Sequence, residues 1–204
     1  MTRKQFFTGI CVLMTVLGVL LCGCPTEDKA DHWKKVTKAK DLYGTWEGSS
    51  SIIVPEIDLE SIFGGGEIPE GLPFSVLAKA PLDYSVRMKI GASEIETKIT
   101  IDCKRYLDAT MGPLTQLVWG LFLKDRIAKI LAETAGIMPD EIEDIQVTDD
   151  YKIIGEGTFP VELTDDTLDD IGEGADLYLN QDKTKLKIVT ETDGTIQELI
   201  LHRK

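Results

Sequence analysis

Apolar and polar residues alternate with a period of two through the middle of the chain. One face of the stretch from 84 to 103, on either side of a Gly91-Ala92 turn, is apolar and carries Tyr84, Val86, Met88, Ile90, Ile95, Ile99, Ile101 and Cys103. The positions between them are charged or polar, as at Ser85, Arg87 and Lys98. This alternation indicates antiparallel strands with one buried and one solvated face.

Further short strands are predicted at 42–54, 145–153 with a turn at Asp149-Asp150, 159–163, 177–179, 186–192 and 195–202. The last two flank Asp193-Gly194, a pair that suits the two-residue turn of a hairpin. Two segments interrupt the strands: a long Gly- and Pro-rich loop at 55–81, and a helix at 113–136 that opens with Pro113 and is apolar nearly all round in its first half. The pattern predicts a mainly β domain, an antiparallel barrel or sandwich of about seven or eight strands with one inserted central α-helix.

The start of the chain has the parts of a secretory signal peptide: a basic pair, Arg3-Lys4, then an apolar run from 6 to 21. The run ends in Leu21-Cys22-Gly23-Cys24, which resembles the bacterial lipobox, although Cys22 replaces the usual small residue at −2. The resemblance implies cleavage after Gly23, lipid such as palmitate on Cys24, and a membrane-anchored protein of the cell envelope. Pro25 at +2, in place of Asp, favours the outer membrane over the inner one. The expected divisions are therefore a leader at 1–23, lipidated Cys24 with a tether at 24–41, and a single domain at 42–204.

Charge and cysteine content narrow the function further. Loss of the leader, with its two basic residues and no acidic one, makes the net charge of −13 more negative by two. Such a surface repels nucleic acid, so a nucleic-acid partner is excluded. Cys103 is then the one cysteine without a leader or lipid role, so no internal disulfide is expected. A small core residue is favoured there over a reactive thiol because Cys103 continues an apolar strand face.

Gly44-Thr45-Trp46, at the start of the first domain strand, is similar to the Gly-x-Trp signature of lipocalins and bacterial lipocalin-like domains. In that family the Trp closes the narrow end of the barrel and an Arg from the end of the last strand packs on it. The resemblance implies a lipocalin-like, calycin-type barrel in which Gly44, Trp46 and Arg203 form the closing signature. The central helix departs from the family, whose long helix usually follows the last strand.

No catalytic centre, metal site or cofactor is predicted. His32 and His202 lie far apart near the two ends of the mature chain, and zinc sites usually need several His or Cys ligands. The acidic run at 165–173 lacks the spacing of an EF-hand calcium loop and is interpreted as solvated charge. Carboxylates are abundant, so a carboxylate-based hydrolase stays open as a lesser alternative to a protein that is not an enzyme.

The leading hypothesis is an extracytoplasmic binding lipoprotein that holds a small apolar or amphipathic ligand inside the barrel. The candidate cavity lining is Tyr84, Val86, Met88, Ile99, Ile101, Trp119 and Phe122. The alternative is a protein–protein interaction lipoprotein with a filled core, which would use loop residues such as Ile62, Phe63 and Phe74. A cavity of about 300 Å³ or more on the inward face would favour the ligand hypothesis.

The lipid anchor is open to a direct test. The Cys24→Ala precursor should stay uncleaved and take up no radiolabelled palmitate, because the modified thiol is absent. Labelling and gel mobility of the wild-type and variant chains in a bacterial host measure both effects. A Cys24→Ala chain that is processed and labelled normally would contradict the anchor.

Overall fold

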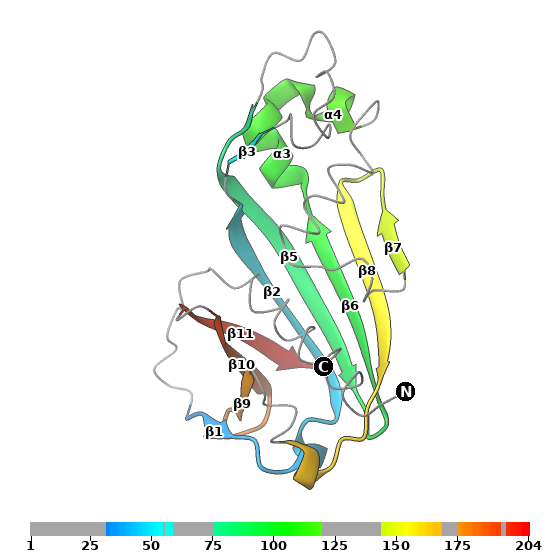
Figure 1. The fold of residues 1–204 in the computed structure, drawn as a ribbon, viewed down its shortest axis with the longest axis vertical. Helices are drawn as coiled ribbons and strands as arrows, with labels where there is room; N and C mark the ends of the chain where they lie inside the picture. The colour runs from blue at the N-terminus through cyan, green and yellow to red at the C-terminus, as the bar shows by residue number, and fades with distance from the viewer. Residues whose placement is uncertain (1–31, 55, 59–75, 120–143, 169–174, 193–194) are drawn as a thin grey trace.

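The structure, a computed structural model, describes residues 32–54, 56–58, 76–119, 144–168, 175–192 and 195–204. Its main feature is one antiparallel sheet of nine strands in the order β1-β9-β10-β11-β2-β5-β6-β8-β7 (Figure 1). The strands are β1 (Lys34–Lys35), β2 (Gly44–Val54), β5 (Ala80–Ile90), β6 (Glu94–Asp102), β7 (Asp144–Val147), β8 (Lys152–Pro160), β9 (Ala175–Leu179), β10 (Lys185–Thr192) and β11 (Thr195–Arg203). A separate ribbon pairs β3 (Ile57–Asp58) with β4 (Val76–Leu77). The prediction of a mainly antiparallel β fold is confirmed.

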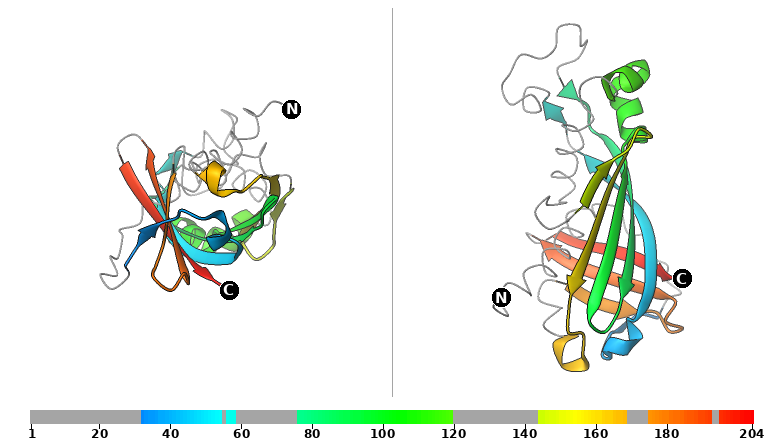
Figure 2. Two further views of the ribbon diagram at one scale, coloured as in Figure 1. Left: turned by 90° about the horizontal axis from the view of Figure 1, so that it is seen from below. Right: turned by 90° about the vertical axis from the view of Figure 1, so that its right-hand side faces the viewer.

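The sheet consists of two groups of strands that meet at β11 and β2. The long strands β2, β5, β6 and β8 run side by side, while β9, β10 and β11 cross them at a steep angle (Figure 2). Only two residue pairs join the groups in the ladder, His202 with Glu47 and Arg203 with Trp46. The sheet therefore bends sharply at this junction and curls around one face.

Gly48 makes this crossing possible. A Cβ atom at position 48 would lie 2.6 Å from the carbonyl oxygen of Ile200 and 2.7 Å from a methyl carbon of Leu201. These distances are far below van der Waals contact, so any larger residue would push β11 away from β2. Glycine in a strand often marks such a close backbone approach.

The β5–β6 hairpin follows the predicted alternation. Ile90 pairs with Ile95 across the turn, and the backbone N–H of Gly91 donates to the carbonyl oxygen of Glu94 at 2.9 Å. The predicted apolar face is buried, and it continues onto β2, β10 and β11 through Trp46, Leu186, Ile188, Leu199 and Leu201. We call this face of the sheet the inner face.

The opposite, outer face is polar. One row across four adjacent strands consists of Glu47, Arg87, Lys98 and Glu156, each paired in register with the next. Ion pairs follow this row, with 3.3 Å between Arg87 and Glu47 and 2.5 Å between Lys98 and Glu156. Exposed pairs of this kind contribute only about 0–1 kcal/mol each, so they set register and solubility more than stability.

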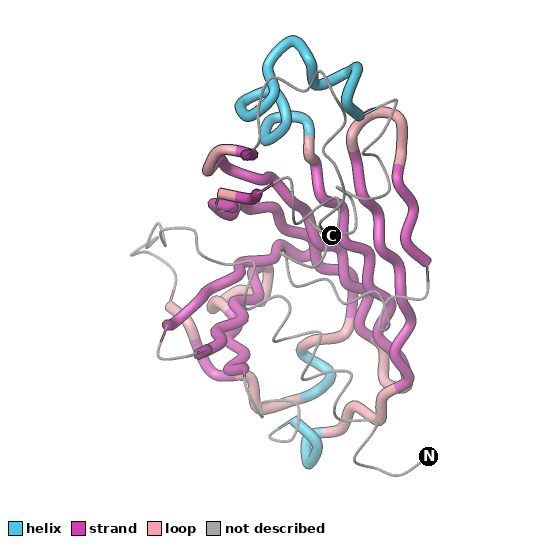
Figure 3. Tube along the Cα trace, turned by 45° about the horizontal axis from the view of Figure 1, so that its top comes forward, coloured by secondary structure: helices cyan, strands magenta, loops and turns pink. Residues whose placement is uncertain are grey.

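The helical region begins earlier than predicted. Helix α3 (Lys104–Met111) follows β6 directly, and a short 3₁₀ turn, η2 (Gly112–Leu114), leads into α4 (Thr115–Val118). These helices lie at one end of the sheet, and two 3₁₀ turns, η1 (Ala39–Asp41) and η4 (Asp165–Thr167), lie at the other (Figure 3). The helix predicted from Pro113 agrees with η2 and α4 at its start, but the prediction missed α3, which begins where Asp102 accepts a hydrogen bond from the Lys104 N–H at 3.0 Å. Residues 120–136 lie outside the described part of the chain.

Four other predictions differ from the structure. The predicted loop at 55–81 contains the β3–β4 ribbon and the start of β5 at Ala80. Residues 159–163 form no separate strand: β8 runs unbroken to Pro160, and the N–H groups of Val161 and Leu163 donate to the β5–β6 turn. The segment assigned to the tether already enters the sheet, because Lys34 and Lys35 pair with β9. The main sheet thus has nine strands where about seven or eight were predicted, and within the described residues no pairing joins its edge strands β1 and β7 into a closed barrel.

The junction between the two groups of strands gives a stability prediction. Gly48→Ala should lower the free energy of unfolding by about 1–3 kcal/mol, since the added methyl group forces β11 and β2 apart. Urea unfolding followed by tryptophan fluorescence measures the loss, with Ser49→Ala at the neighbouring exposed position as the control. A Gly48→Ala loss no larger than that of the control would show that the strands do not approach so closely.

Candidate functional site

The predicted closing signature is assembled at one end of the inner face. Gly44 has a φ of 133°, a backbone conformation that glycine adopts readily and other residues rarely do. Two residues later the strand carries Trp46. The Trp46 ring is fully buried, and its Nε1 donates a hydrogen bond to the carbonyl oxygen of Leu42 at 2.6 Å. Strand β2 is thereby tied to the segment that precedes it.

Arg203 completes this end of the domain. Its guanidinium carbon lies 4.5 Å from the centroid of the Trp46 ring, the contact that the sequence predicts, and its Nη2 donates to the carbonyl oxygen of Asp41 at 2.5 Å. A cation over an indole face contributes about 0.5–2 kcal/mol. Lys183 forms a 2.9 Å ion pair with Asp41, and its hydrogen bond is the main cause that lowers the pKa of that carboxyl. The segment before β2 and the C-terminal end of β11 are therefore fastened to each other here.

The candidate cavity residues lie deep in the core. Those that the structure describes are each at most 3% exposed: Tyr84, Val86, Met88, Ile99, Ile101 and Trp119. The strand register brings Tyr84 opposite Ile101 and Val86 opposite Ile99, so the strand residues form one continuous apolar patch. Phe122 lies outside the described residues.

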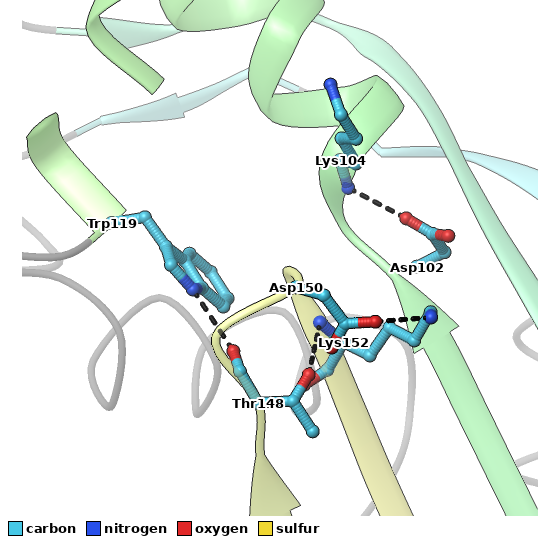
Figure 4. A network of polar contacts seen from close by, with 6 residues as sticks. All are labelled: Asp102, Lys104, Trp119, Thr148, Asp150 and Lys152. Atoms are coloured by element: carbon cyan, nitrogen blue, oxygen red, sulfur yellow. Dashed lines mark hydrogen bonds and ion pairs between the residues drawn. The ribbon is translucent and has the colours of Figure 1, made fainter. Parts of the chain in front are cut away.

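Trp119 belongs to the same buried cluster and lies at the helical end of the sheet. Its Nε1 donates to the carbonyl oxygen of Thr148 at 3.2 Å (Figure 4). Its ring centroid lies 5.5 Å from that of Tyr151. The β7–β8 turn that receives it is held by the Thr148 hydroxyl, which accepts the Lys152 N–H at 3.1 Å. Trp119 thus fastens α4 to the sheet, a role that apolar spacing alone could not reveal.

Three hydroxyl groups on or beside the inner face lack a hydrogen-bond partner in the described structure: those of Tyr84, Thr97 and Tyr106. Their residues are only 3%, 6% and 0% exposed, respectively. A buried hydroxyl without a partner costs about 1–3 kcal/mol, so such groups are rare in folded proteins and call for an explanation. On a face that is apolar apart from Ser50 beside Tyr84, they are the buried polar groups to which a bound molecule could bond.

Burial keeps the ionisable groups of this region uncharged. It is the main cause that raises the pKa of Tyr84 to about 12. The hydroxyl of Ser50, the register partner of Tyr84 on β2, opposes this rise because it lies near the phenol, although the two do not meet the geometry of a hydrogen bond. Burial likewise raises the pKa of Tyr106 to about 12 and that of Cys103 to about 12. The Cys103 thiol is therefore protonated at neutral pH, which agrees with a core residue and not with a nucleophile.

Two hollows lie on the outer face of the sheet. One of about 570 Å³ is lined mainly by polar residues that include Glu47, Ser85, Lys98 and Lys204. The other, of about 410 Å³, adjoins it and shares Arg87 and Lys98. The charged groups of both hollows are already paired with one another across the strands. Both hollows are therefore interpreted as parts of a solvated sheet surface whose charges neutralise one another, and not as ligand sites.

The described residues that were considered for metal chemistry do not converge. Within the described ranges no three His, Cys, Asp or Glu side chains come together in a way that could hold a metal ion. Asp165 of the acidic run has a structural role instead, since its carboxylate accepts the N–H of Ala39 at 2.7 Å and joins η4 to η1. Asp169, Asp170 and Glu173 lie outside the described residues, as does Cys24.

Sequence reasoning missed Thr97 and Tyr106 as inner-face residues of interest. Thr97 occupies an inward position of β6 that the alternation does mark, between Ile95 and Ile99. Tyr106 could have been found from the α3 sequence, in which Tyr106, Leu107 and Met111 fall on one helical face. That neither hydroxyl finds a partner is visible only in three dimensions.

The described part of the chain contains no helix long and apolar enough to cross a membrane. Comparison of the chain with protein-family models, with curated proteins and with solved structures finds no match.

Proposed function

We propose that this chain is a lipid-anchored binding lipoprotein of the bacterial cell envelope, exported and held at a membrane through Cys24. Its domain carries a small apolar or amphipathic molecule on the inner face of the curved sheet, near Tyr84, Val86, Met88, Ile99 and Ile101. The lipobox-like leader supports the anchor and the location, with the outer membrane favoured. The protein acts by binding and is not an enzyme.

The unpartnered hydroxyls are the observation that carries the ligand proposal. A face that served only as packed core would be expected to hold Phe and Val in place of Tyr84, Tyr106 and Thr97, because each unpartnered hydroxyl destabilises the fold by about 1–3 kcal/mol. A ligand with hydrogen-bonding groups would remove that penalty on binding. The apolar residues around the hydroxyls would contribute by burying its hydrocarbon.

The closing contact supports a related proposal about architecture. The stacking of Arg203 on Trp46, next to Gly44, is the arrangement that the lipocalin-like resemblance implies. We propose a lipocalin-like barrel that is left open between β1 and β7. An open side would give a hydrophobic ligand a route to the inner face.

A second candidate function is recognition of another protein by a domain whose core is filled. The near-complete burial of the described candidate cavity residues favours this alternative, because it leaves little of their surface for a ligand. Recognition would then involve loops, among them Ile62, Phe63 and Phe74, which lie outside the described residues.

Native mass spectrometry separates the two functions. The mature chain with Cys24→Ala is exported through a signal peptide without a lipobox, so that it reaches the envelope without lipid, and is purified without detergent. The expected result is a reproducible additional mass that disappears on denaturation, because the inner face retains its ligand.

The contrary result is a bare polypeptide mass that stays bare after incubation with fatty acids, phospholipids and extracted envelope lipids. It would contradict the ligand proposal and favour the protein-interaction function. The same protein denatured before incubation is the control for lipid that adheres without a specific site.

A further inference from the structure

Two of the unpartnered hydroxyls belong to the same end of the inner face. Tyr84 lies on β5 opposite Ile101 of β6, and β6 runs from there through Cys103 into α3, which carries Tyr106. Helix α3 packs against β5, and Cys103 lies close enough to Tyr106 to influence its phenol. The helical end of the sheet therefore buries two phenol groups from two elements, while Thr97 lies nearer the Trp46 end.

The surroundings of these phenols are uncharged. Among the described residues, the buried polar or charged set consists of Thr97, Thr115 and Asn180 alone, and contains no Lys, Arg, His, Asp or Glu. Lys104 and Arg105 of α3 are exposed, and they pair with Asp108 and Asp83 at the surface. A charged group brought to the buried phenols would lose its water without gaining a counter-ion, which strongly disfavours its binding.

From these two observations we infer the class of ligand: an amphipathic molecule with an uncharged, oxygen-bearing head group, such as an ester or alcohol, that bonds to the hydroxyls of Tyr84 and Tyr106. The inference rests on the proposed function, since it names the chemistry of the molecule held on the inner face. An ester carbonyl accepts hydrogen bonds, and an alcohol both donates and accepts them, so either satisfies phenol groups. A carboxylate, phosphate or ammonium head would require a buried counter-ion that the described residues do not supply.

The protonation of the phenols fits this class. Burial raises the pKa of both tyrosines to about 12, so each keeps its proton and can donate to an ester oxygen across the physiological pH range. Binding of an uncharged ligand should accordingly be independent of pH between about 6 and 9.

The first arm of the test compares head groups on the same hydrocarbon chain. The mature Cys24→Ala chain, freed of bound lipid, is titrated with 1-palmitoylglycerol and with palmitate, and tryptophan fluorescence reports binding. The glycerol ester should bind at least about tenfold more tightly than the carboxylate. Equal or tighter binding of palmitate would overturn the inference and leave the proposed function standing, whereas binding of neither ligand would overturn both.

The second arm removes the hydroxyls one at a time. Tyr84→Phe and Tyr106→Phe should each weaken binding of 1-palmitoylglycerol about three- to tenfold, yet leave the melting temperature of the ligand-free protein unchanged or higher. Tyr43→Phe is the matched control, because the Tyr43 hydroxyl donates to the carbonyl oxygen of Leu163 at 2.9 Å. Its loss should lower the melting temperature without altering affinity.

Two outcomes of this arm would contradict the inference. Unchanged affinity in both Tyr84→Phe and Tyr106→Phe would show that the hydroxyls do not contact the head group. A lowered melting temperature in both, as in Tyr43→Phe, would show that the hydroxyls are already bonded in the ligand-free protein.

Discussion

Strands β11 and β2 meet at a crossing and not along a full ladder, and the shape of the domain depends on that crossing. Gly48 lets the backbones approach, and the stacking of Arg203 on Trp46 holds them beside the junction. Because the two groups of strands share only two residue pairs, the sheet turns sharply there and surrounds one face. The contacts of Asp41 with Arg203 and Lys183 add further bonds at the same end of the domain.

The curvature separates two kinds of surface. The outer face carries charged rows that neutralise one another, and its hollows are polar and open. The inner face gathers the large apolar side chains, and it is the only described region where buried hydroxyls lack partners. Apolar burial favours the fold wherever it occurs, but an unpartnered hydroxyl opposes it. This difference between packing and polar satisfaction is the physical basis for proposing a ligand on the inner face.

The sequence predicts well the features that depend on local periodicity. The two faces of β5 and β6 follow from strict alternation, and the β10–β11 hairpin follows from Asp193-Gly194 and the apolar runs beside it. The start of α3 is harder to predict. Cys103 continues the alternation of β6, so the pattern does not show where the strand ends, and the Asp102 side chain is the local signal of the change.

Other features leave no periodic signal. Strand β1 is two lysines long, too short for alternation to reveal, and it joins the sheet only because β9 offers an open edge. Nothing near Gly48 in the sequence shows that glycine is required there, because the requirement comes from the close approach of β11. The Trp46–Arg203 contact came from a family resemblance, because the two residues lie at opposite ends of the domain sequence.

A crystal structure of the mature Cys24→Ala chain, purified with the lipids that it retains from the envelope, would test the ligand-binding account most directly. The account predicts an elongated molecule on the inner face, with an uncharged oxygen within hydrogen-bond distance, about 2.5–3.0 Å, of the Tyr84 and Tyr106 hydroxyls. Ordered water molecules bonded to both hydroxyls, with no ligand on the inner face, would contradict it.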